Sequence, residues 1–218
     1  MRLLLKHRDI LKIQLRSILR VSASFPVEIL LPMVTSIEEV IESRKILENI
    51  KSSLRAEGTR FNPQIPLGVM IEVPSAVMIA RRLAKEVDFL SLGANDLIQY
   101  ILIADRASNE MAAYYEPLHP AVLQAIKFLV DASQEAGKEL SICGEMAGDP
   151  IYTELLIGLG IRNFSIAPGE ILEIKEVLRS VSTRKAQGLA ERVLEMTTVQ
   201  EIREGLKNSK LSDYPKVA

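Results

Sequence analysis

Five short apolar runs, each separated from the next by a helical pattern, constrain the fold of this chain most strongly. They cover residues 27–33, 67–73, 88–93, 139–143 and 162–166. Strands that alternate with helices predict a parallel α/β sheet, because parallel neighbours need a crossover connection. Two layouts meet this condition. One is an open doubly wound sheet, and the other is a (β/α)8 barrel, of which five strands would be only a part.

Helix start signals follow several of these runs. Ser36 and Glu39 have the spacing of a capping box. Asn95 and Asp96 are expected to cap the helix after the third run, and Pro120 suits the first position of a long helix. From about residue 170 onward the pattern is helical. The chain therefore predicts an α/β domain with further helices at its C-terminal end.

Composition excludes several classes of protein. A single cysteine, Cys143, rules out an intrachain disulfide framework and suits a reducing, cytoplasmic setting. The two histidines, His7 and His119, lie far from it, which disfavours a structural zinc site. The chain has no tryptophan, only 5% aromatic residues and no interleaving of basic and aromatic residues, which argues against a nucleic-acid partner.

The first 20 residues are basic, with six Lys or Arg against one Asp. A membrane-surface or targeting helix is one interpretation of such a start. The segment lacks an apolar core and a small-residue cleavage site, so an amphipathic domain helix with a solvated basic face is preferred. No apolar stretch approaches the length of a membrane span, and no membrane insertion is expected.

Polar residues gather where the runs end. In parallel α/β folds the ligand site lies beyond the carboxyl ends of the strands. Glu72 ends the second run, Asn95 and Asp96 follow the third, and Cys143 and Glu145 follow the fourth. We expect these side chains to share one rim of the sheet.

Glu72 and Asp96 form a candidate metal site. Two carboxylates on adjacent strand ends suit Mg²⁺, which fills its shell with water and phosphate oxygens. A structural salt bridge for Glu72 and a helix cap for Asp96 are the alternatives. Arg106 is a candidate phosphate ligand, although a lone arginine is more often a surface residue. Cys143 alone is more often inert core than catalyst.

Five motifs in this order resemble a known family. They are Gly-Val-Met-Ile-Glu-Val-Pro (68–74), Asp-Phe-Leu-Ser-Leu-Gly-Ala-Asn-Asp-Leu (88–97), Asp-Arg (105–106), His-Pro-Ala-Val (119–122) and Cys-Gly-Glu-Met-Ala-Gly-Asp-Pro (143–150). Together they resemble the phosphoenolpyruvate (PEP)-binding domain of Enzyme I of the bacterial PEP:sugar phosphotransferase system, or of its nitrogen-related paralogue. Pyruvate phosphate dikinase and PEP synthase match the last motif less closely. Ala94 departs from the Thr or Ser usual in the family.

The resemblance implies a (β/α)8 TIM barrel that binds PEP and Mg²⁺ at its carboxyl-end mouth. It assigns Glu72 and Asp96 as Mg²⁺ ligands. Asn95, Asp96 and Arg106 would bind the substrate, and Cys143 would protonate the enolate to give pyruvate. It also implies a cytoplasmic homodimer whose phosphocarrier partner is reached through an N-terminal domain.

The family's phosphoryl acceptor is a histidine on a separate domain, and neither His7 nor His119 matches its motif. The chain is expected to begin inside or just after the third barrel strand, at residues 2–5, and to retain about strands four to eight. Residues 1–205 would form this partial barrel and 206–218 a tail. Such a chain is expected to be inactive alone. A dimerisation module and a free-standing lyase or aldolase acting on PEP or pyruvate remain the alternatives.

Overall fold

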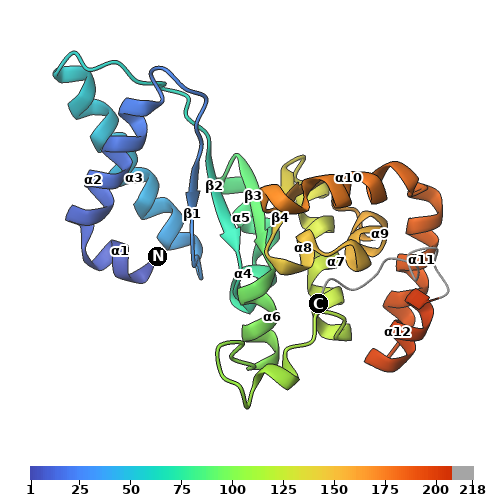
Figure 1. Ribbon diagram of the computed structural model, residues 1–218. Coiled ribbons are helices and arrows are strands. Elements are labelled where there is room, and N and C mark those ends of the chain that lie inside the picture. Colours follow the sequence, from blue (N-terminus) through green and yellow to red (C-terminus); the bar gives the residue numbers. More distant parts are fainter. Residues whose placement is uncertain (208–218) are drawn as a thin grey trace.

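The computed structural model describes residues 1–207, which form one parallel sheet with helices packed around it (Figure 1). The sheet has the order β1-β2-β3-β4-β5, and every pair of neighbours is parallel. The strands are β1 (Ile29–Leu31), β2 (Leu67–Ile71), β3 (Phe89–Gly93), β4 (Glu139–Cys143) and β5 (Asn163–Ser165). This sequential strand order confirms the prediction that the strands are consecutive strands of a barrel. The doubly wound alternative, which requires a reversal of strand order, is wrong.

Helices cover the sheet and also lie beyond both of its edges (Figure 1). In Figure 1 the N-terminal helices lie beside β1, whereas the C-terminal helices gather beyond β4. The first group is α1 (Arg2–Lys6), α2 (Arg8–Val21) and α3 (Ile37–Ala56). The middle group is α4 (Pro74–Met78), α5 (Ala80–Glu86), α6 (Ala94–Leu102) and α7 (Pro120–Glu135). The last group is α8 (Glu145–Gly148), α9 (Pro150–Leu159), α10 (Ile171–Ser180), α11 (Thr183–Glu195) and α12 (Val199–Lys207), with 3-10 turns at Ala112–Tyr114 and Pro168–Glu170.

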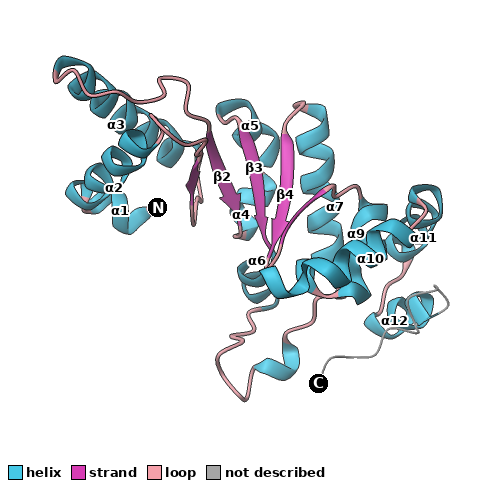
Figure 2. Ribbon diagram, turned by 45° about the horizontal axis from the view of Figure 1, so that its top comes forward, coloured by secondary structure: helices cyan, strands magenta, loops and turns pink. Residues whose placement is uncertain are grey.

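The two faces of the sheet differ in chemistry. Val69, Ile71, Leu90 and Leu92 are fully buried and alternate with Met70 and other residues of the opposite face. Helices α5 and α7 lie along β2, β3 and β4 in Figure 2. The hydrophobic face therefore packs under the helix layer, which leaves the other face free to carry polar residues.

Two local predictions need correction. Residues 2–5, allowed as the end of a strand, belong to helix α1. This short helix packs the half-buried Leu4 and Leu5 against the core, and His7 (φ −109°, ψ 65°) separates it from α2. The predicted capping box does not form, because Ser36 makes no side-chain cap bond; Glu39 instead accepts hydrogen bonds from Thr35.

The C-terminal boundary is described only in part. Leu206 and Lys207 continue helix α12, and residues 208–218 of the predicted tail lie outside the described residues. The boundary at residue 205 stays a prediction. Within residues 1–207, none of the helices combines the length and apolar character that crossing a bilayer requires.

Candidate functional site

Strand register brings the predicted rim residues into one row. Gly93 pairs with Cys143, and Cys143 pairs with Ser165, so the carboxyl ends of β3, β4 and β5 lie level. Glu72 follows β2 directly at the same height. A Cβ added at Gly93 would lie 2.8 Å from the Glu72 Cβ, so Gly93 allows the two strand ends to approach this closely. Sequence reasoning placed these residues correctly at one rim.

Glu72 is the most buried carboxylate of this rim. The residue is only 4% exposed, and its Oε1 accepts a hydrogen bond of 2.5 Å from the backbone N–H of Met33. Met33 has a φ of 49°, an uncommon left-handed conformation for a residue other than glycine. The turn after β1 thus points a backbone donor at Glu72, which no sequence signal had indicated.

Asp96 lies beside Glu72, and the two carboxyl groups interact. Burial raises the pKa of Glu72, the Met33 N–H opposes this rise, and the charge and hydrogen bonding of Asp96 add to it. Close carboxylates that resist joint ionisation are a common arrangement for a bound cation. Among residues 1–207, Glu72 forms no ion pair with a Lys, Arg or His side chain.

The donor set fits Mg²⁺ better than a metal that needs a full protein cage. No cluster of three or more His, Cys, Asp or Glu able to hold a metal occurs in the described part of the chain. Mg²⁺ commonly takes one or two carboxylates and completes its octahedron with water and substrate oxygens. Glu72 and Asp96 supply that number.

Asn95 does not cap its own helix, contrary to expectation. The N-cap of α6 is Gly93, and both Asn95 and Asp96 lie in the first helical turn. Asn95 Oδ1 instead accepts a hydrogen bond of 2.9 Å from the backbone N–H of Glu145. Asn95 therefore joins the rim of β3 to the rim of β4.

Arg106 reaches the same place from the irregular segment after α6. Its Nη1 lies 3.4 Å from Glu145 Oε1, and Asn95 Nδ2 lies 3.5 Å from that same oxygen. The structure thus brings together the two side chains expected to bind phosphate. It adds Glu145 between them, a residue that the sequence placed at the rim without a role.

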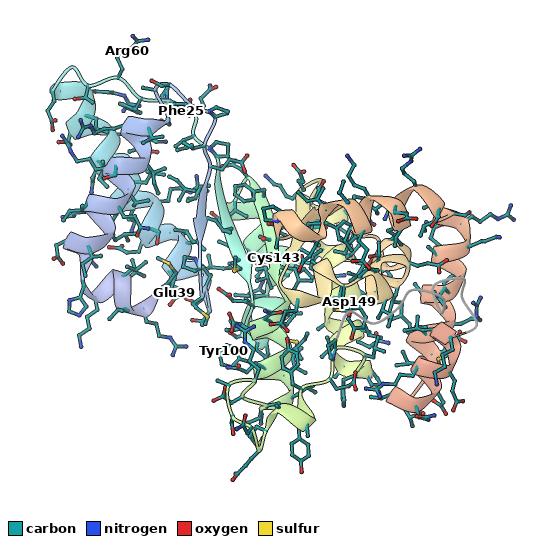
Figure 3. The ribbon with its side chains drawn as sticks, in the orientation of Figure 1. Phe25, Glu39, Arg60, Tyr100, Cys143 and Asp149 are labelled. Carbon is teal, nitrogen blue, oxygen red and sulfur yellow. The ribbon has the colours of Figure 1, made fainter. Side chains whose placement is uncertain are left out.

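Gly144 permits this arrangement. Its φ of 102° favours glycine, and a Cβ there would lie 2.6 Å from Asn95 Oδ1. Asp149, the second carboxylate of the motif, does not join the contacts of Arg106 and Asn95. Its Oδ1 instead accepts a hydrogen bond from the backbone N–H of Ile151 and caps α9. In Figure 3 Asp149 and Cys143 both lie near the middle of the molecule, far from Phe25 and Arg60.

Tyr115 is a site residue that sequence reasoning missed. Its hydroxyl lies 3.5 Å from both the backbone oxygen and Oδ1 of Asn95. Burial and then the Glu145 charge raise the pKa of Tyr115 to about 12, so it remains a hydrogen-bond donor at neutral pH. It belongs to an irregular segment without helical or strand periodicity, and only tertiary folding delivers it.

Cys143 ends β4 and is half-buried beside the carboxylate pair. Burial raises the pKa of its thiol, a hydrogen bond from Ser91 opposes the rise, and the charges of Glu72 and Asp96 add to it. Ser91 in turn accepts a hydrogen bond of 3.1 Å from Ser141. A thiol kept protonated at the rim is suited to give a proton rather than to attack as a thiolate.

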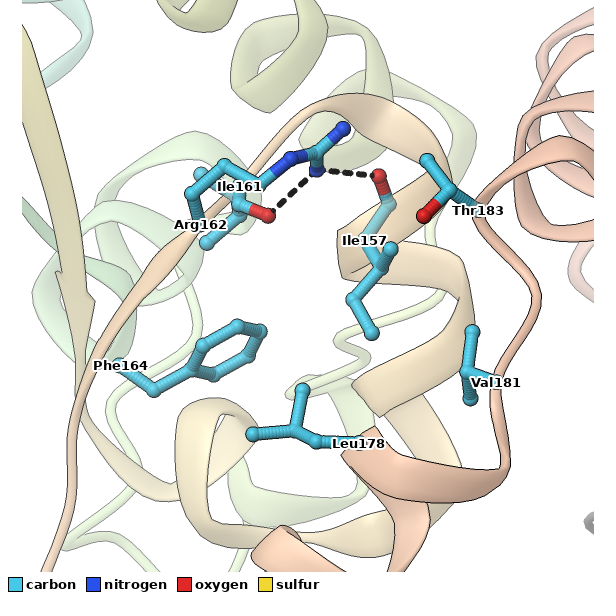
Figure 4. A pocket seen from close by; sticks show the side chains of 7 residues that line it. All are labelled: Ile157, Ile161, Arg162, Phe164, Leu178, Val181 and Thr183. Atoms are coloured by element: carbon cyan, nitrogen blue, oxygen red, sulfur yellow. Dashed lines mark hydrogen bonds between the residues drawn. The ribbon is translucent and has the colours of Figure 1, made fainter.

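A cavity of about 190 Å³ lies elsewhere, between β5, α9 and α10 (Figure 4). Its only charged lining residue is Arg162, whose Nη1 donates to the carbonyl oxygens of Ile157 and Ile161 at 2.8 and 2.7 Å. The rest of the lining is apolar except for Thr183. None of the rim residues borders this cavity, so the candidate site is the polar rim.

Comparison with known proteins shows which family this chain resembles. Residues 1–183 match the family described as "PEP-utilising enzyme, PEP-binding domain". Three relatives are each named phosphoenolpyruvate-protein phosphotransferase and align over 201 residues, 92% of this chain and 35% of their own length. They come from Haemophilus influenzae (44% identity), Listeria monocytogenes (39%) and Bacillus subtilis (38%). The chain therefore spans about a third of the length of these curated relatives.

Two solved structures share the fold at low sequence identity. A citrate lyase from Burkholderia xenovorans LB400 matches with a TM-score of 0.55 and 19% identity over 89% of this chain and 65% of its own. An HpcH/Hpal aldolase/citrate lyase family protein from Burkholderia cenocepacia J2315 matches with a TM-score of 0.51 and 18% identity, over 78% and 69%. Such likeness concerns architecture alone. Together, the ordered rim motifs and the match over residues 1–183 show that this chain belongs to the PEP-binding domain family of PEP-utilising enzymes.

Proposed function

We propose that this chain is the PEP-binding portion of a phosphoenolpyruvate-protein phosphotransferase, which moves a phosphoryl group from PEP to a protein histidine and releases pyruvate. The observation that carries the proposal is the convergence of Glu72, Asp96, Asn95, Arg106 and Cys143 at one rim. The names of the relatives support it.

Glu72 and Asp96 would hold Mg²⁺ together with oxygens of the substrate. When bound, the cation supplies positive charge that offsets the phosphate and the enolate oxygen. The Met33 N–H fixes the orientation of Glu72, and the first turn of α6 fixes Asp96. Glu72 and Asp96 would therefore bind and orient the cation and the substrate, without taking part in the bonds that form and break.

Arg106 and Asn95 would bind the phosphate through the guanidinium and the side-chain amide. As the bond between phosphorus and the enol oxygen breaks, the phosphoryl group passes to a histidine nitrogen. The Cys143 thiol then gives its proton to C3 of the enolate, which forms the methyl group of pyruvate and leaves a thiolate. The raised pKa of Cys143 keeps that proton available before the step.

The acceptor histidine is proposed to lie on a separate domain. His119 caps α7, where its Nδ1 accepts from the backbone N–H of Ala121 at 3.1 Å. His7 is exposed at the junction of α1 and α2. Neither belongs to the rim, which fits a chain that binds PEP without accepting its phosphoryl group. A phosphocarrier partner, a homodimer and a cytoplasmic location complete the proposal.

Isothermal titration tests the binding half of the proposal. PEP with Mg²⁺ should release or absorb heat with a 1:1 stoichiometry, and the signal should depend on the metal. Matched titrations with Ca²⁺ or without metal serve as controls. Metal-independent binding would contradict the assigned roles of Glu72 and Asp96. The lyase or aldolase alternative draws on the lack of an acceptor histidine in this chain, whereas the names of the relatives and the ordered motifs support phosphotransfer.

A further inference from the structure

A single carboxylate oxygen contacts both side chains assigned to phosphate. Glu145 Oε1 lies 3.4 Å from Arg106 Nη1 and 3.5 Å from Asn95 Nδ2. A phosphate oxygen that bound these same two nitrogens would have to take the place of Glu145 Oε1. The Glu145 carboxylate thus occupies the position at which the proposed function requires the substrate phosphate.

We infer that the Glu145 carboxylate competes with the substrate phosphate for Arg106 and Asn95, and thereby limits how tightly a phosphorylated ligand binds. The inference rests on the proposed function, because it takes these two residues as the phosphate ligands. A phosphate that uses Arg106 Nη1 and Asn95 Nδ2 must first displace this carboxylate oxygen, which costs part of its binding free energy. A ligand without a phosphate, such as the unphosphorylated product, makes no such exchange. The residue therefore weakens the binding of phosphorylated acids and affects the unphosphorylated product less.

The geometry permits the side chain to move while its backbone stays. The Glu145 N–H donates to Asn95 Oδ1 at 2.9 Å, which fixes the start of α8. The Glu145 side chain is 75% exposed, and its contacts at 3.4 and 3.5 Å are long. Exposed ion pairs of this kind are weak. A rotation about the side-chain bonds therefore releases Arg106 without disturbing the strand ends.

The neighbouring carboxylates are not free to rotate in the way that the Glu145 side chain is. Asp149 is committed to the cap of α9, and Glu72 is buried against the Met33 N–H. Among the rim carboxylates of residues 1–207, Glu145 alone is ion-paired to Arg106. Its replacement should thus affect phosphate binding specifically rather than the fold.

Glu145→Gln tests the inference, because it removes the charge and keeps the shape. Glu110→Gln is the control: it makes the same charge change at an exposed position of the segment that carries Arg106. Titration with PEP and with inorganic phosphate, each with Mg²⁺, should show roughly two- to fivefold tighter binding for Glu145→Gln than for Glu110→Gln. Affinity for pyruvate should change less than affinity for PEP.

The outcomes separate this inference from the proposed function. If the unchanged protein binds PEP but Glu145→Gln binds it no better than Glu110→Gln, the competition is refuted and the proposed function stands. Binding that appears only in Glu145→Gln supports the inference. If no variant binds PEP with Mg²⁺, the proposed function and the inference both fall. Circular dichroism melting of each variant verifies that all compared proteins are folded.

Discussion

The two halves of the rim are built differently. The carboxylate half, Glu72 and Asp96, sits on a strand end and a helix start, with Glu72 only 4% exposed and bonded at 2.5 Å. The proposed phosphate half depends on Arg106, whose side chain is 42% exposed and whose Nη1 lies 3.4 Å from Glu145 Oε1. One half is fixed by the sheet, and the other is adjustable.

This difference shows that the side chains held most firmly lie on strand ends, whereas the side chain free to move lies on an irregular segment. Strand ends hold side chains by backbone hydrogen bonds and packing, so a metal site built on them needs little rearrangement. Arg106 belongs to an irregular segment between α6 and α7, and such segments open at lower free energy than the sheet. The rigid half would bind the cation, while the adjustable half exchanges Glu145 for a substrate.

Cys143→Ser should produce the largest effect, since it removes the proposed proton donor at the rim. We expect pyruvate formation to slow by about 10²–10⁴-fold with PEP binding preserved. The assay needs the phosphoryl-accepting domain, supplied on the same polypeptide or separately. Ser165→Ala, level with Cys143 on β5, is the matched control. A near-normal rate with lower stability would reduce Cys143 to a packing residue.

Asp96→Ala should abolish the metal-dependent part of PEP binding. The loss should exceed about 100-fold, because residues that only orient a metal ligand already cost 10–100-fold. Titration with PEP at fixed Mg²⁺ measures it. Asp131→Ala, which removes a surface ion pair with Lys127, should leave affinity unchanged. Retained metal dependence in Asp96→Ala would mean that this carboxylate is not a ligand.

Arg106→Ala should weaken PEP binding by about 10–100-fold, since a hydrogen bond to a charged group contributes roughly 1.5–3 kcal/mol. Arg106→Lys should recover only part, because an ammonium cannot bind phosphate in the bidentate manner. Titrations of the three proteins give the comparison. Equal affinities would make Arg106 an ordinary surface residue and leave the adjustable half without a phosphate ligand.

Glu72→Gln should stabilise the protein at pH values above the raised pKa of Glu72 when no metal is added. Because folding raises the pKa of Glu72, its ionised form costs stability as pH rises through that pKa, and the cost is absent below its unfolded pKa. The gain should be about 1 kcal/mol, or about 2–4 °C in melting temperature at this chain length. Thermal melts from pH 4 to pH 8 should show the gain vanish at low pH. Mg²⁺ should stabilise the unchanged protein more than the variant.

Arg203→Ala should have the smallest effect. Arg203 of α12 forms an ion pair with Glu116, near the end of the segment that carries Arg106 and Tyr115. The Arg203 side chain is 55% exposed, so loss of the pair should cost no more than about 1 kcal/mol. PEP affinity should fall by less than about threefold. The swap Arg203→Glu with Glu116→Arg should restore it if the pair positions the segment.

Sequence alone determined the arrangement of the rim. Five strand–helix units in regular succession predict parallel strands. Glu72 and Asp96 come after strands and Cys143 ends one, so their carboxyl-end position follows from topology. The ordered motifs also identified the family before any geometry was available. These features are local or depend on strand order, which periodicity encodes directly.

Only the tertiary structure decided which groups touch. The Met33 N–H on Glu72, the Asn95 link to Glu145 in place of a helix cap, and the Tyr115 hydroxyl beside Asn95 join residues 20 to 50 positions apart. Their hydrogen bonds require a backbone conformation or a loop path without periodicity, such as the positive φ of Met33. Periodicity reports which face of an element is buried, and it carries no information about which polar atoms meet across two elements once the chain has folded.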